Sequence, residues 1–159
     1  MANYSVSNTL AGTQQNLSTS YKTLVTVNSL STTQARRGCV YDIMVGTDGT
    51  PADNAVVYDL SRLNGTAGTA TSATPTALNP ADAAYLGAAV VNTTIESANI
   101  TAASSVWSIG VNQRASYRWV AAPGSEFYYP ATTLNGFVLR AKSPAYTSTV
   151  VGTILITEI

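Results

Sequence analysis

The feature that most constrains the fold is an alternation of apolar and polar residues with a period of two, which recurs along most of the chain. It is clear in GCVYDIMVG (38–46), NAVVYDLSRL (54–63) and TSTVVGTILITEI (147–159). Successive residues of a strand point to opposite faces, whereas a helix would repeat its apolar residues every three or four positions. These runs are short, rich in β-branched and aromatic residues, and separated by turn signals such as Asn-Gly and Pro-Gly. We therefore expect an all-β chain.

The number of runs and the lengths between them select among all-β architectures. Eight or so short strands with uneven loops favour two antiparallel sheets packed as a β-sandwich. The connection between about Leu63 and Val90 is long enough to cross over, which favours a jelly roll over an up-and-down barrel. We expect residues 21–159 to form this single domain. The chain of 159 residues can bury a core of its own without a metal or disulfide.

Three stretches depart from the alternation. NPADAAYLGAA (79–89) predicts at most one short helix, because Asn79 can cap it and Gly87 would end it. Residues 64–76 are small and polar, which predicts a surface excursion or a contact with a neighbouring chain. Residues 1–20 carry few apolar anchors, so we expect an N-terminal arm that orders only in an assembly.

Composition narrows the classes of function. Charged residues make up 10% of the chain, against about 25% in an average domain. The surface is therefore built largely from uncharged polar residues, which suits packing against neighbours because docking desolvates few ions. Eight basic and eight acidic residues cancel, so we expect no nucleic-acid partner. No apolar run approaches the about 20 residues of a membrane span, so we expect no membrane partner.

Catalytic and metal chemistry have few candidate residues. The chain has no histidine, the commonest general base and metal ligand, and its single cysteine, Cys39, indicates a buried thiol. Asp48, Asp53 and Asn54 share one loop and could offer oxygen ligands to calcium. Their spacing does not match the known calcium loop, and turn formation explains them as well. We expect no metal and no cofactor.

Two acidic residues on neighbouring strand patterns, Asp42 and Asp59, could approach each other as the carboxylate pair of a glycosidase. At this low charge density, pairing with Arg62, Arg114 or Arg118 is the stronger expectation. No set of nucleophile, base and orienting residue can be assembled, so we expect that the protein is not an enzyme.

The stretch NQRASYRWVAAPGSEFYYP combines arginines with aromatic rings. Alternation places Arg114 and Arg118 on one face of a strand and Tyr117 and Trp119 on the other. We expect the rings in the core and the arginines towards solvent or a neighbouring subunit, an arrangement unsuited to a nucleic-acid platform. Pro123-Gly124 suits a type II turn, which we expect at a corner where the chain changes sheet.

Four segments, GTDGTPADN (46–54), PADAA (80–84), NQRA (112–115) and RWVAAPG (118–124), are similar to a family of small virion proteins of tailed bacteriophages. These segments lie in two stretches, Tyr41–Ala84 and Asn112–Tyr146, which together cover about half of the chain. The resemblance implies a structural role in the virion and, more specifically, a capsid decoration or cement protein with a jelly-roll fold. It carries over no catalytic residue.

Our leading hypothesis is a homotrimer on the capsid exterior that clamps copies of the major capsid protein. The first residues lack a signal-peptide pattern, so we expect synthesis in the host cytoplasm. The candidate interface residues are Arg114, Arg118, Arg36, Arg37 and Tyr4. The alternative is a receptor- or glycan-binding head of a phage fibre or spike, because the nine tyrosines can stack on sugar rings.

Overall fold

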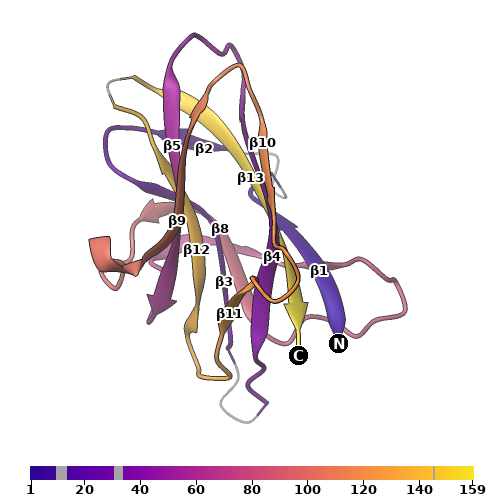
Figure 1. Cartoon of the computed structure of the whole chain (residues 1–159). Coiled ribbons are helices and arrows are strands. Elements are labelled where there is room, and N and C mark those ends of the chain that lie inside the picture. Colours follow the sequence, from indigo (N-terminus) through magenta and orange to yellow (C-terminus); the bar gives the residue numbers. More distant parts are fainter. Residues whose placement is uncertain (10–13, 31–33, 145) are drawn as a thin grey trace.

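The computed structural model describes residues 1–9, 14–30, 34–144 and 146–159. Its strands form two antiparallel sheets packed face to face, which confirms the predicted all-β sandwich (Figure 1). Sheet A contains β1 (Ala2–Ser7), β2 (Gln15–Leu17), β4 (Gly38–Asp48), β7 (Thr76–Ala77), β10 (Tyr117–Val120), β11 (Phe127–Tyr129) and β13 (Ser148–Glu158). Sheet B contains β3 (Lys22–Asn28), β5 (Ala55–Asn64), β6 (Thr69–Ala73), β8 (Ala88–Ile95), β9 (Ser105–Asn112) and β12 (Asn135–Lys142). A single 3-10 turn, η1 (Ala102–Ser104), precedes β9.

The strand order is that of a jelly roll. The main strands, in chain order, are β1, β3, β4, β5, β9, β10, β12 and β13. The first pairs with the last, the second with the seventh, the third with the sixth and the fourth with the fifth. Such a chain is one long antiparallel ribbon rolled into two sheets. The termini consequently lie side by side at one end of the sandwich (Figure 1).

The core lies between the sheets, where alternation brings one side of every strand inward. Phe137 and Ile154 have no exposed surface, and burying a side chain of this size contributes about 1.5–3 kcal/mol. Close approach of the sheets requires a glycine on β13. A Cβ on Gly152 would lie 2.8 Å from a methyl group of Leu24 and of Leu139.

The predicted N-terminal arm is wrong for residues 2–7. They form β1, which pairs with β13 on one side and with β7 on the other. Tyr4 and Val6 are each only 1% exposed and belong to the core. The alternation in β1 is too short to be recognised alone, and its partner is the last strand of the chain. Residues 10–13 of that arm lie outside the described residues.

The polar excursion at 64–76 is more ordered than its composition predicts. It contains β6, which extends sheet B beside β8, and leads into β7, which extends sheet A beside β1. The chain therefore leaves sheet B, adds a strand to the margin of sheet A, and returns to sheet B at β8. Backbone pairing places these small side chains, together with hydrogen bonds from the hydroxyls of Ser97 and Thr94 to the carbonyls of Thr66 and Thr69.

The helix expected at 79–89 is absent. Asn79 instead closes a turn, and its side-chain oxygen accepts a hydrogen bond from the N–H of Ala81 at 3.1 Å. The ring of Tyr85 then packs edge-on against Tyr4, with ring centres 5.2 Å apart. A helix of two turns is marginal by itself, so this anchoring to the sandwich prevails. One short 3-10 turn remains in the described chain, within the predicted limit of one helix.

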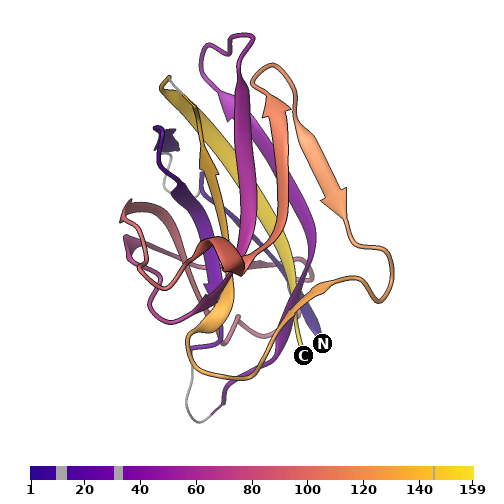
Figure 2. The ribbon, with the colours of Figure 1, turned by 60° about the vertical axis from the view of Figure 1, so that its left-hand side comes forward.

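The centre of the outer side of sheet B is covered by the protein itself. Strands β8 and β9 are separated by β3, β12 and β5, so residues 96–104 must cross all three. Glu96 fastens this connection, because its carboxylate accepts hydrogen bonds from the N–H and hydroxyl of Thr23 at 2.9 and 2.6 Å. Figure 2 shows the connection and η1 lying across sheet B. Val138, which alternates with core residues of β12, is consequently fully buried.

Candidate interaction face

The outer side of sheet A remains open, in contrast to sheet B. On β13 the buried positions alternate with positions that keep part of their surface exposed. The residues of β4 and β10 that lie in register with these positions face the same side of the sheet. We call the outward side chains of these three strands the sheet A outer face. It consists of Asp42, Met44, Arg118, Val120, Val151, Thr153 and Leu155.

This face is more apolar than an ordinary solvated sheet. Outward positions of an antiparallel sheet are normally polar when water covers them. Here Met44, Val151 and Leu155 are half-buried, and Val120 is 56% exposed. A shallow hollow of about 480 Å³ opens beside Met44 and Tyr117. Exposed apolar surface of this kind marks protein contact sites.

One ion pair lies within the sheet A outer face. The Nε of Arg118 is 3.1 Å from both carboxylate oxygens of Asp42, and its Nη2 is 2.5 Å from one of them. The predicted pairing of an acidic strand residue with Arg118 is confirmed. Asp42 is almost fully buried, whereas the Arg118 side chain is 61% exposed. The hydrogen bonds and charge of Asp42 raise the pKa of Arg118 further.

The other predicted interface arginines lie outside this face. Arg114 sits on a loop and makes an exposed pair with Asp53 at 3.3 Å. Arg36 and Arg37 are exposed in the segment before β4. The guanidinium of Arg37 lies 4.7 Å from the centre of the Tyr128 ring. The predicted interface arginines therefore lie in three surface regions. Among them, only Arg118 belongs to the sheet A outer face.

Tyr4 is not an interface residue of the folded chain. Its side chain is in the core, and its hydroxyl donates a hydrogen bond to the carbonyl of Ala83 at 2.9 Å. The contact fixes the 78–87 excursion to β1. The interface prediction for Tyr4 depended on the arm, and it fails because the arm is a strand.

The aromatic residues of β10 are less buried than alternation predicts. Tyr117 is 37% exposed, so its predicted place in the core is wrong. Trp119 is half-buried and stacks on Phe127 with ring centres 4.7 Å apart. Strand β10 lies at the end of the sheet A path, where fewer neighbours cover its side chains.

The turn after β10 has the predicted type but not the predicted role. The N–H of Ser125 bonds to the carbonyl of Ala122 at 2.8 Å, and Gly124 has a φ of +83°, as a type II turn requires. Both β10 and β11 nevertheless pair with β4. The chain therefore bulges and returns to the same sheet, and the expected change of sheet does not occur.

The acidic loop residues do not converge on a metal site. The carboxylate of Asp48 accepts hydrogen bonds from Gln14 at 2.6 Å and from the N–H of Gly49 at 2.7 Å. Asp53 instead faces Arg114. Among the residues that the structure describes, no three His, Cys, Asp or Glu side chains are grouped to hold a metal ion.

The remaining candidate groups are structural. Asp42 and Asp59 lie in different sheets, so they do not form a carboxylate pair. Asp59 binds Arg140, an ion pair that the sequence did not indicate. Cys39 is 5% exposed, as predicted, and burial raises the pKa of its thiol.

The chain was compared with models of protein families, with curated proteins and with solved structures, and none of them matches it. Within the described residues there is no helix long and apolar enough to cross a membrane. Function must therefore be argued from the fold and from the sites that the chain itself presents.

Proposed function

We propose that the protein is a structural component of a bacteriophage virion, a capsid decoration protein that binds the shell through the sheet A outer face. The observation that carries this proposal is the asymmetry of the sandwich. Residues 96–104 cover the centre of the outer side of sheet B, while the corresponding side of sheet A presents apolar side chains to solvent. A contact surface left open on one side is what attachment to a shell requires.

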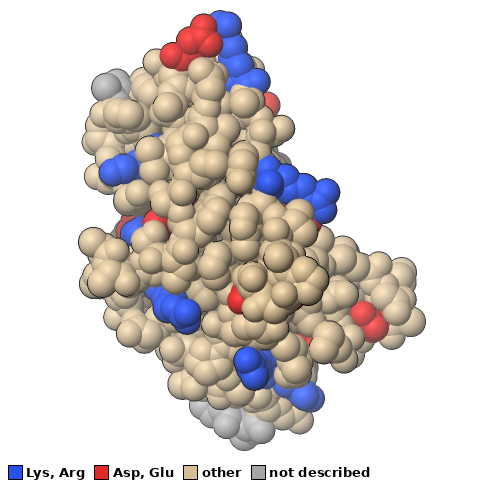
Figure 3. Space-filling model, in the orientation of Figure 1, with Lys and Arg blue, Asp and Glu red and all other residues tan. Residues whose placement is uncertain are grey.

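The charge distribution supports the same role. Charged side chains lie singly or in small groups on the visible surface, with wide uncharged areas between them (Figure 3). Docking such a surface removes few ions from water, so little of the apolar contact energy is offset by desolvation. The partners in this proposal are copies of the chain, as a homotrimer, and the major capsid protein. Many identical weak contacts over a shell add up to tight retention.

The localisation follows from this role. The chain would be made in the host cytoplasm and added to the capsid exterior. The jelly-roll fold is common in viral capsid and lectin domains, so the fold agrees with the resemblance in the four sequence segments without deciding between these functions.

Replacing Val120 and Val151 by glutamine should remove capsid binding without unfolding the protein. Both side chains lie on the sheet A outer face, and glutamine adds polar atoms that an apolar contact would leave unpaired. We expect at least a tenfold weaker retention on capsids, corresponding to about 1.4 kcal/mol or more. The measurement is co-sedimentation of the purified protein with capsids stripped of it.

The matched control is Ile95→Gln, which makes the same change at a 65% exposed residue of β8 in the other sheet. This variant should bind like the wild-type protein. Equal retention of the double variant and the wild type would contradict the proposed contact face. Absence of the chain from purified capsids by mass spectrometry would contradict the virion role itself.

Reversing the charge of Arg114 tests whether the loop that carries it also contacts the capsid, without a large change in stability. Its pair with Asp53 is exposed on both sides, and such pairs contribute about 0–1 kcal/mol. Arg114→Glu should therefore keep the wild-type melting temperature within a few degrees. If the loop also contacts the shell, retention on capsids falls. Arg118 is unsuited to this test, because a glutamate there would face the buried carboxylate of Asp42.

A further inference from the structure

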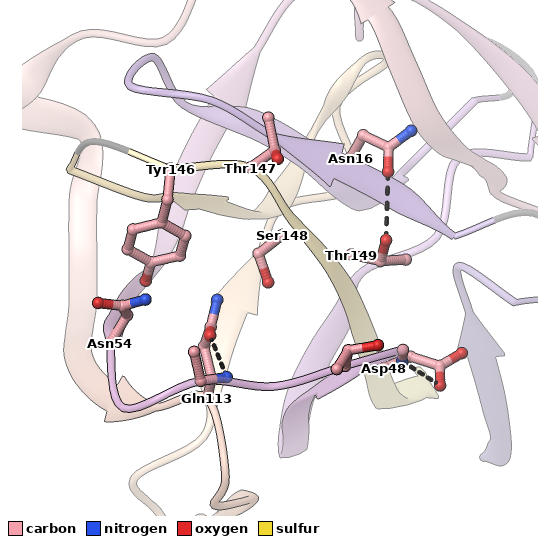
Figure 4. Close-up of a pocket in the computed structure, with 11 residues that line it drawn as sticks. Asn16, Asp48, Asn54, Gln113, Tyr146, Thr147, Ser148 and Thr149 are labelled. Atoms are coloured by element: carbon pink, nitrogen blue, oxygen red, sulfur yellow. Dashed lines mark hydrogen bonds between the residues drawn. The ribbon is translucent and has the colours of Figure 1, made fainter.

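A polar cleft of about 250 Å³ lies at the end of the sandwich opposite the termini (Figure 4). Four separate segments meet there: β2, the β4–β5 loop, the β9–β10 turn and the start of β13. The side chains that matter for its chemistry are Asn16, Asn54, Gln113, Tyr146, Ser148 and Thr149. None of them belongs to the sheet A outer face.

Gln113 is held rigidly at the base of this cleft. Its N–H donates to the carbonyl of Asn54 at 2.8 Å, and its own carbonyl accepts a hydrogen bond from the hydroxyl of Thr47. The side-chain oxygen accepts the N–H of Ala52 at 2.8 Å. These three contacts fix the backbone and the orientation of the amide. The residue is only 5% exposed.

The remaining group of Gln113, its side-chain NH₂, is turned into the cleft. With the oxygen held by Ala52, the nitrogen points towards the side of the cleft formed by Ser148 (Figure 4). It makes no hydrogen bond with the described part of the chain. The described buried side-chain atoms that lack a partner do not include this nitrogen, so it reaches the cleft, where water or a ligand can accept its hydrogen bond. The fold therefore holds a donor ready for an incoming oxygen atom.

The charge of the cleft favours a neutral ligand. Among the described residues, its lining contains no lysine or arginine and a single carboxylate, Asp48. That carboxylate already accepts hydrogen bonds from Gln14 and Gly49. Amide and hydroxyl groups make up most of the other polar lining, and each can exchange hydrogen bonds with a hydroxyl group. This donor and acceptor set suits a ligand with several closely spaced hydroxyls.

Tyr146 supplies an apolar surface beside these polar groups. Its hydroxyl donates to the carbonyl of Ala55, which fixes the ring at one side of the cleft. An aromatic ring next to amides and hydroxyls presents the apolar and polar surfaces that a sugar ring needs. The volume is below the about 300–1,000 Å³ of sites for drug-sized ligands, so the cleft accommodates one ring of a glycan.

We propose that this cleft binds a neutral saccharide through a single pyranose ring. The NH₂ group of Gln113 donates to a ring hydroxyl, Ser148 and Asn54 bind neighbouring hydroxyls, and the ring of Tyr146 packs on the C–H side of the sugar. The inference does not depend on the capsid role. A protein anchored by the sheet A outer face would carry this cleft as a second, separate site.

The deciding variant is Gln113→Glu. It keeps a side-chain oxygen for the N–H of Ala52, and it replaces the NH₂ donor by a second oxygen that carries a negative charge. Binding is first located on a printed array of bacterial and animal glycans and then measured by titration with free glucose, galactose and N-acetylglucosamine. We expect saturable binding by the wild type, at least a tenfold loss in Gln113→Glu, and a smaller loss in Ser148→Ala. The control Gln34→Glu adds the same charge to an exposed residue before β4. It stands three residues before Arg37, whose carbonyl accepts the N–H of Ile159 at the end of the sandwich that holds the termini.

Three outcomes would overturn the proposal. The first is the absence of saturable binding to any glycan or free sugar by the folded wild type. The second is wild-type affinity in Gln113→Glu, with Gln34→Glu equally unchanged. The third is binding restricted to sulfated or sialylated glycans and removed by raised salt, which would indicate nonspecific charge contacts. Melting curves of all three variants show whether a loss of binding comes from unfolding. The capsid-retention experiments test the proposed virion role separately, and their result does not affect the test of sugar binding.

Discussion

Replacing Arg140 by methionine is expected to lower the free energy of unfolding by about 3–5 kcal/mol, because it leaves the buried carboxylate of Asp59 without its counter-ion. The Nε of Arg140 lies 2.7 Å from an oxygen of Asp59, and the two side chains are 11% and 3% exposed. The residues are also direct partners across β12 and β5. The pair therefore lies within the sheet and has little access to water.

The surroundings of Asp59 explain why the loss should be large. Its carboxylate also accepts hydrogen bonds from the hydroxyls of Ser61 and Ser105, which satisfy it but carry no positive charge. The guanidinium of Arg140 is covered by Tyr21, whose ring centre is 4.3 Å away. The methionine variant would therefore keep a desolvated negative charge that only neutral donors contact.

Urea unfolding followed by tryptophan fluorescence measures this change. The control is the double variant Arg140→Met, Asp59→Asn, in which the amide oxygen accepts one serine hydroxyl, the amide NH₂ can donate to the other serine oxygen, and no charge remains. We expect it to recover much of the lost stability, since a buried pair can often be replaced by neutral groups at little cost. A loss below about 1 kcal/mol in the single variant would show that water reaches Asp59.

Burial, and not the presence of opposite charges, decides the size of this effect. The pair between Arg114 and Asp53 has the same chemistry, but its side chains are 61% and 74% exposed. Water screens that pair and its partners remain solvated when it breaks, so its contribution is about 0–1 kcal/mol. Sequence alone cannot separate the two cases, because alternation puts Arg140 on one strand face with Val138 and Lys142 but does not show whether that face is covered.

The fold was largely predictable because its signals are local. Alternation along 38–46 and 147–159 assigns each residue to a face without knowledge of its partner, and turn residues delimit the strands. The long connection before β8 then favoured the jelly roll. Two errors arose where a distant partner decides the structure. Residues 2–7 become a strand by pairing with β13, and 79–89 follow the docking of Tyr85 instead of forming a helix.

The sites were less predictable than the fold. The segments 46–54 and 112–115 stood out in the sequence for their resemblance, but nothing local indicates that they touch. In the structure they meet at the cleft. The N–H of Gln113 donates to the carbonyl of Asn54, and the side-chain oxygen of Gln113 accepts the N–H of Ala52. The sheet A outer face could have been suspected from the apolar outward residues of β13. Which side of the sandwich stays open depends on the path of 96–104, which only the assembled structure reveals.

The stability of the protein should fall steeply above pH 10, because buried tyrosines resist ionisation in the folded state. Burial raises the pKa of Tyr129 from the ordinary 10.0 to about 12. It also raises the pKa of Tyr58 and of Tyr85, whose hydroxyl lies 3.0 Å from that of Tyr129. Below pH 10 these groups are neutral in both states and the full stability is present. Between pH 10 and 12 the unfolded chain releases protons that the folded chain retains, so unfolding becomes easier.

For Tyr129 alone, a difference of two pH units corresponds to about 3 kcal/mol lost by pH 12. The free energy of unfolding, measured with urea from about pH 8 to about pH 12, should fall as the pH rises. Tyr129→Phe should reduce the slope of this fall by the contribution of about one proton. All these variants are made in a protein that also carries Cys39→Ala. Burial raises the pKa of the Cys39 thiol too, so its titration would lower the stability in the same direction as pH rises. The control is Tyr117→Phe, which removes a hydroxyl from a ring that is 37% exposed. Comparing the two variants distinguishes the effect of losing a buried hydroxyl from the effect of losing any tyrosine. An unchanged slope in Tyr129→Phe would mean that the pair of hydroxyls between Tyr85 and Tyr129 opens to water before the protein unfolds.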